Sequence, residues 1–95
     1  MTEELAVRDA YLRECAATVL RSGPEGVVLD RTVFYPRGGG QPGDTGTLYW
    51  GESAARVTDT CWEEGDIRHI LEGGPVPPVG ESVRAVIDWD RRHLL

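Results

Sequence analysis

Alternation of apolar and polar side chains is the feature that most limits how this 95-residue chain can fold. The alternation is clearest in Val27–Val33, Ala55–Cys61 and Val83–Ile87. A period of two is typical of strands with one buried face, and no intervening stretch has the period of a helix. The pattern therefore predicts an all-β fold. The expected strands are Glu14–Arg21, Gly26–Val33, Thr45–Trp50, Ala54–Trp62, Asp66–Glu72 and Ser82–Asp88.

Six short strands in so small a domain suggest a small barrel or a closed sandwich, and of these we expect a mostly antiparallel β-barrel. Closure removes exposed strand edges, which a chain of this length could not otherwise cover. The turn residues Ser22–Gly26 predict that the first two strands form a hairpin, and Glu63–Gly65 predicts a second, tight hairpin turn. The prolines of residues 73–81 predict a loop. Residues 1–7 are expected to be a loose or late-docking terminus.

Composition narrows the class of protein. The net charge of −6 weighs against a domain that binds nucleic acid by itself, unless its ten basic residues, all Arg, gather on one face. No apolar run reaches membrane-spanning length, and the acidic N-terminus is unlike a signal peptide. We therefore expect a cytoplasmic protein with no membrane partner.

The most unusual stretch is residues 34–46, where three consecutive glycines lie between Pro36 and Pro42. Glycine permits a very close approach of another backbone or a ligand, but it loses the most entropy on ordering. Gln41 is the only side-chain carboxamide of the chain, and its donor and acceptor could bind a base edge, a ribose hydroxyl or a peptide group. A plain turn between two strands remains the alternative. A phosphate cradle is disfavoured, because no Lys follows and Asp44 would repel an anion.

Residues 34–46, Phe-Tyr-Pro-Arg-Gly-Gly-Gly-Gln-Pro-Gly-Asp-Thr-Gly, resemble the glycine-rich signature of alanyl-tRNA editing proteins of the AlaX type and of the editing region of alanyl-tRNA synthetase. The similarity continues in Val28–Thr32 and in Val86–Arg92, and it extends from about Tyr11 to the end of the chain. In the G-G-x-G-Q core, Arg37 stands where the family often has its first glycine. The resemblance implies a barrel of the kind found in translation proteins.

The resemblance also implies a function. The family hydrolyses the ester between a wrongly attached serine or glycine and the acceptor end of the tRNA for alanine. Its zinc ligands lie in a second domain, so residues 1–88 would be the glycine-motif barrel and residues 89–95 the start of a linker helix to a missing catalytic domain. No catalytic residue, metal ligand or cofactor is then expected in this chain, while the missing domain would hold zinc. The loop residues expected to face the substrate pocket are Gly38, Gly39, Gly40, Gln41 and Asp44.

Other residues offer weaker hypotheses. A zinc site would need Cys15, Cys61, His69 and His93 to converge, although no two of them have paired-ligand spacing. His69 lies between apolar positions of a strand, which favours a packed histidine over a ligand. No spacing suggests a nucleophile and its base, so an autonomous enzyme is the least favoured function. The main alternative to the editing domain is a non-catalytic β-barrel module that presents its loop to a protein or RNA partner.

Overall fold

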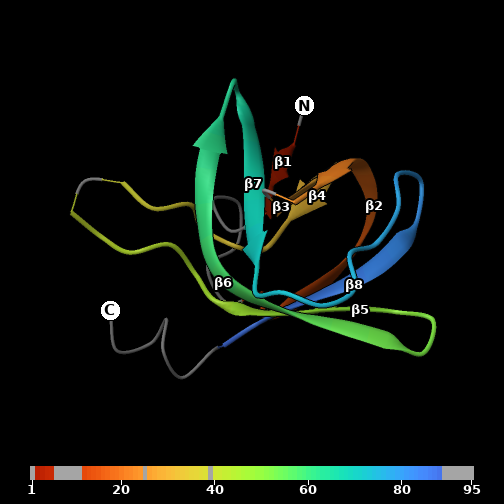
Figure 1. The fold of residues 1–95 in the computed structure, drawn as a ribbon. Coiled ribbons are helices and arrows are strands. Elements are labelled where there is room, and N and C mark those ends of the chain that lie inside the picture. The colour runs from red at the N-terminus through yellow and green to blue at the C-terminus, as the bar shows by residue number, and fades with distance from the viewer. Residues whose placement is uncertain (1, 6–11, 25, 39, 89–95) are drawn as a thin grey trace.

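A computed structural model describes residues 2–5, 12–24, 26–38 and 40–88. Six strands close into a barrel in the order β2-β3-β7-β6-β5-β8, and every neighbouring pair is antiparallel (Figure 1). The described residues form no regular helix, so the predicted all-β, six-stranded barrel is confirmed. The barrel strands are β2 (Glu14–Gly23), β3 (Gly26–Leu29), β5 (Gly46–Trp50), β6 (Ser53–Glu63), β7 (Asp66–Leu71) and β8 (Ser82–Ile87).

The barrel interior is filled by the apolar positions of the alternating pattern. Leu29, Leu48 and Val57 are fully buried, and Phe34 closes the interior at the point where the glycine-rich stretch begins. Both predicted hairpins are present, since β2 pairs with β3 and β6 pairs with β7. The second hairpin turns at Glu64 and Gly65, which both have positive φ, as a two-residue turn between twisted strands requires.

The strand expected over Gly26–Val33 is divided at Asp30. Its first part is β3, and its second part is the short strand β4 (Arg31–Thr32), which pairs in parallel with β1 (Glu3–Glu4). Asp30 exchanges backbone and side-chain hydrogen bonds with Thr18, and this interaction replaces the regular ladder at the division. The small parallel sheet of β1 and β4 was not expected from the sequence pattern.

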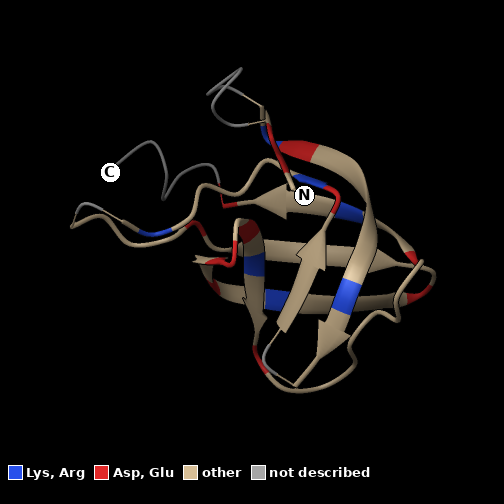
Figure 2. Ribbon diagram, turned by 90° about the horizontal axis from the view of Figure 1, so that it is seen from above, with Lys and Arg blue, Asp and Glu red and all other residues tan. Residues whose placement is uncertain are grey.

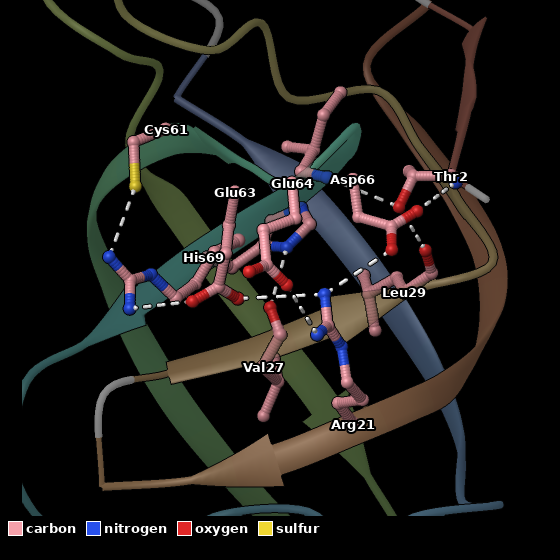
Figure 3. A network of polar contacts seen from close by, with 11 residues as sticks. Thr2, Arg21, Val27, Leu29, Cys61, Glu63, Glu64, Asp66 and His69 are labelled. Carbon is pink, nitrogen blue, oxygen red and sulfur yellow. Dashed lines mark hydrogen bonds and ion pairs between the residues drawn. The ribbon is translucent and has the colours of Figure 1, made fainter.

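The N-terminal segment is docked on the barrel at residues 2–4. The Thr2 N–H donates to a carboxylate oxygen of Asp66, and the Thr2 hydroxyl donates to the carbonyl oxygen of Leu29 (2.7 Å) (Figure 3). Asp66 in turn accepts a hydrogen bond from Arg21. Of the two expectations for residues 1–7, loose or docked, the structure shows the docked one for the part it describes.

β6 contains a bulge that breaks its predicted alternation. Val57 pairs with Leu71 and Asp59 with Ile70, so Thr58 is an extra residue without a partner of its own on β7. Regular alternation would have placed Asp59 on the interior face. The bulge instead buries Thr60 completely and leaves Asp59 partly exposed.

Several expectations concern residues outside the described ranges. These are the start of the family similarity at Tyr11, the linker helix over residues 89–95, including His93, and a short turn that Asp9 favours as a possible capping residue. Among the described residues, no helix is long and apolar enough to cross a membrane.

Candidate functional site: the glycine-rich loop

The glycine-rich stretch forms a loop that projects from the barrel between β4 and β5 (Figure 1). Its neck is closed by Tyr35 and Asp44. The Asp44 N–H donates to the Tyr35 carbonyl oxygen (2.9 Å), and the Tyr35 N–H donates to the Asp44 carboxylate (2.8 Å). Asp44 is buried, with 6% of its surface exposed, so its carboxylate lies at the base of the loop rather than at its tip.

Thr60 attaches the loop to the side of the barrel. Its carbonyl oxygen accepts the Arg37 N–H (2.8 Å), and its hydroxyl donates to the Asp44 carbonyl oxygen (2.9 Å). Gly43 passes so close to this strand that a Cβ built on it would lie 2.7 Å from the Thr60 nitrogen and would overlap the carbonyl oxygen. Glycine at position 43 is therefore required by the close approach of two backbones.

The tip of the loop is a narrow hairpin. Gly38 and Gln41 exchange two backbone hydrogen bonds of 3.1 and 2.9 Å, and Gly40 has a φ of +84°. Gly39 lies outside the described residues. A Cβ built on Gly38 would meet nothing within 4 Å, and the Gln41 side chain is exposed. Thus nothing within the described part of the chain requires glycine at 38 or a carboxamide at 41.

A buried hydrogen-bond chain fixes the start of the loop. The Phe34 N–H donates to the Thr32 hydroxyl (3.0 Å), and that hydroxyl lies 2.7 Å from Nε2 of His69. Nδ1 of His69 lies 3.2 Å from the Val27 carbonyl (Figure 3), which can only accept. Nδ1 therefore carries the proton, and Nε2 accepts from Thr32. His69 is fully buried, and this burial lowers its pKa to about 4. His69 is therefore a neutral, packed histidine, as its position in the strand predicted.

The end of the loop meets the last residue of the barrel. The Asp88 N–H donates to the carbonyl oxygen of Thr45, and the Thr45 hydroxyl donates to the Asp88 carboxylate (2.6 Å). Both terminal nitrogens of Arg56 also bind this carboxylate, and this pairing raises the pKa of Arg56. The chain consequently leaves the barrel beside the base of the loop.

The described candidate metal ligands, Cys15, Cys61 and His69, belong to no metal-binding group. The described residues contain no group of three or more His, Cys, Asp or Glu side chains that could hold a metal ion. Both ring nitrogens of His69 are already hydrogen-bonded, to Thr32 and Val27. Burial raises the pKa of the Cys15 thiol. The Cys61 sulfur accepts from Arg68 (Figure 3). The described residues therefore form no zinc site, and His93 lies outside them.

The structure adds residues that sequence reasoning missed. Asp59 and Thr60 hold the loop against β6, and Arg56 binds the strand end beside it. The one available signal was Asp59 itself, a charged residue at a position that the alternation predicted to face the interior.

Comparison with known proteins defines the family. A family model described as tRNA synthetases class II (A) matches residues 5–91, so the chain belongs to that family. It is 47% identical to an alanine–tRNA ligase of Pyrobaculum arsenaticum over 95 residues. It is also 42% identical to the alanyl-tRNA editing protein AlaX-L of Pyrococcus horikoshii over 98 residues and 41% identical to AlaX-M of the same organism over 95 residues. The relationship expected from the glycine-rich stretch is confirmed.

The matches cover nearly all of this chain but only part of each relative. The aligned region is 99% of this chain and 10% of the ligase, 98% and 24% for AlaX-L, and 100% and 43% for AlaX-M. The chain thus corresponds to one region that synthetases and editing proteins of this family have in common.

Proposed function

We propose that this chain is the glycine-motif barrel domain of a hydrolase that removes serine or glycine from mischarged tRNA for alanine in the cytoplasm. Residues 1–88 form the barrel domain, and residues 89–95 begin the connection to a zinc-containing catalytic domain that is not among these 95 residues. The barrel contributes no catalytic group. Its role is to present the glycine-rich loop to the acceptor end of the tRNA in the pocket of the catalytic domain.

The tip of the loop is the observation that carries this proposal. Gly38 has open space where a side chain would lie, and the Gln41 carboxamide is exposed. A turn that served only the barrel would have no need of these residue types, whereas a loop that approaches a substrate closely would have need of both. The neck and the attachment to Thr60 tie the base of the loop to the barrel on both sides.

The exit of the chain supports the same arrangement. Because Asp88 is bound to Thr45, the residues that follow position 88 start at the base of the loop. A following domain therefore needs no long connection to reach the loop. Within this arrangement, Gly38, Gly39, Gly40 and Gln41 face the pocket, and Asp44 supports them from the neck.

Deacylation by the product of the complete reading frame that contains residues 1–95 tests the proposal. We expect this protein to release serine and glycine from the tRNA for alanine and to leave alanine attached. A complete product that binds a partner through the loop but hydrolyses neither ester would instead support a non-catalytic binding module.

A further inference from the structure

The bulge in β6 directs one carboxylate toward the loop. Asp59 follows the extra residue Thr58, and its carboxylate has two partners. One oxygen accepts the Thr60 N–H (2.8 Å), and the other accepts from Nη1 of Arg37 (2.8 Å). Bulges commonly redirect a side chain beside a functional site, and this one turns an acidic residue from the expected interior face to an arginine of the loop.

Arg37 is hydrogen-bonded through both its backbone and its side chain, and some of its guanidinium N–H donors remain unused within the described part of the chain. Its backbone N–H is bound to Thr60, and its guanidinium is bound to Asp59 through Nη1. A guanidinium has five N–H donors, and the remaining ones make no hydrogen bond to the described residues. Its side chain is 55% exposed. The ion pair with Asp59 thus orients the Arg37 side chain and leaves guanidinium N–H groups available for a ligand.

Arg37 is also the exposed cation of the loop. Residues 34–46 contain two charged residues, Arg37 and Asp44, and Asp44 is buried at the neck. Figure 2 shows a basic segment on the projecting loop, in agreement with the one arginine among residues 34–46. The neighbouring glycine, Gly38, has no side chain that could shield the guanidinium from a ligand at the tip.

We propose that Arg37 binds a phosphate group of the RNA strand whose end the loop receives, and that Asp59 is the positioning residue that orients its guanidinium. Planar guanidinium groups bind phosphate oxygens through paired N–H donors, and one such edge remains available while Nη1 is held by Asp59. The inference rests on the proposed function, because it takes the phosphate to belong to a tRNA.

Salt-dependent binding separates a phosphate contact from a surface ion pair. The experiment measures the Kd of the complete gene product for uncharged tRNA for alanine over a series of NaCl concentrations. The variants are Arg37→Gln, which removes the cation, and Asp59→Asn, which breaks the same ion pair but keeps the cation. Arg84→Gln is the matched control, since Arg84 is an exposed arginine paired with Glu14 (3.0 Å) on the barrel, outside the loop.

We expect Arg37→Gln to weaken binding roughly three- to tenfold and to reduce the slope of log Kd against log[NaCl] by about one. Asp59→Asn should weaken binding by about twofold and leave the slope unchanged, because the cation is still present but is no longer oriented. Unchanged binding of Asp59→Asn would overturn the positioning role of Asp59. Equal effects of Arg37→Gln and Asp59→Asn would overturn the assignment of Arg37, and so would equal effects of Arg37→Gln and Arg84→Gln. Neither result would affect the proposed function. If the unaltered protein does not bind this RNA, the proposed function fails together with the inference.

Discussion

Tyr35 and Asp44 bind each other through two hydrogen bonds, one between backbone groups and one from the Tyr35 amide to the Asp44 carboxylate. The pair closes the loop where it leaves the barrel. Asp44→Ala should therefore remove the charged acceptor of the Tyr35 N–H in this partly buried hydrogen bond and lower the free energy of unfolding by about 1–3 kcal/mol. Urea denaturation of the 95-residue chain measures this loss. Gln41→Ala is the control and should change stability by less than about 0.5 kcal/mol. Equal stability of both variants would show that the neck does not depend on Asp44.

Substitution by Ala should lower the stability of the barrel at one glycine of the loop and leave it unchanged at another. In Gly43→Ala the new Cβ meets the Thr60 backbone, so we expect a loss of about 1–3 kcal/mol. In Gly38→Ala the new Cβ enters open space, so stability should stay within about 0.5 kcal/mol of the parent. The same denaturation series measures both. A destabilised Gly38→Ala would mean that glycine at this position serves the fold.

The buried His69 should make stability depend on pH. Its pKa is lowered from 6.5 to about 4 in the folded state, so between these values the unfolded chain binds a proton that the folded chain does not. Stability is therefore complete above pH 6.5 and falls as the pH decreases from 6.5 toward 4, by up to about 3 kcal/mol in all.

Unfolding measured between pH 7 and pH 5 tests this dependence, in a range above the ordinary pKa values of Asp and Glu. His69→Gln is the matched variant, since an amide can still bind Val27 and Thr32 but does not titrate. The variant should lose most of the slope. A slope as steep in the variant as in the parent would assign the dependence to other groups.

The contacts of Asp88 should stabilise the barrel more than a simple surface pair does. Asp88 follows the end of β8, and it accepts from Thr45, just before β5, and from both terminal nitrogens of Arg56 within β6. We expect Asp88→Ala to cost about 1–2 kcal/mol. Glu14→Ala, which breaks the exposed pair with Arg84, should cost less than about 0.5 kcal/mol. Denaturation of both variants under one set of conditions makes the comparison, and a larger loss for Glu14→Ala would contradict it.

The barrel could be predicted from the sequence because the evidence for it lies within short segments of the chain. Alternation in segments such as Ala55–Val57 and Val83–Ile87 follows directly from the pleat of a strand, and closure follows from the lack of any other cover for the strand edges. The bulge at Thr58 could not be predicted in this way, since it depends on contacts of Asp59 and Thr60 with a loop distant in sequence. A docked N-terminus was one of two expectations, but its contact between Thr2 and Asp66 joins residues 64 positions apart and could not be located for the same reason.

The loop itself was recognisable from its glycines, but the separate roles of those glycines were not. Sequence alone could not distinguish Gly43, which a neighbouring backbone requires, from Gly38, which has open space around it. It also grouped Asp44 with the pocket-facing residues, whereas the structure places its carboxylate on the Tyr35 amide at the neck. Such distinctions depend on which backbone lies opposite each residue, and that is a property of the folded chain.

The central claim is that the loop tip serves a substrate and not the barrel. The most direct test is the rate at which the complete gene product releases serine from the tRNA for alanine, measured for the parent and for Gln41→Ala together with their melting temperatures. We predict an unchanged melting temperature and a rate reduced roughly two- to tenfold, as expected for one lost hydrogen bond to a neutral group. An unchanged rate at an unchanged melting temperature would contradict the claim and reduce the tip to a structural turn.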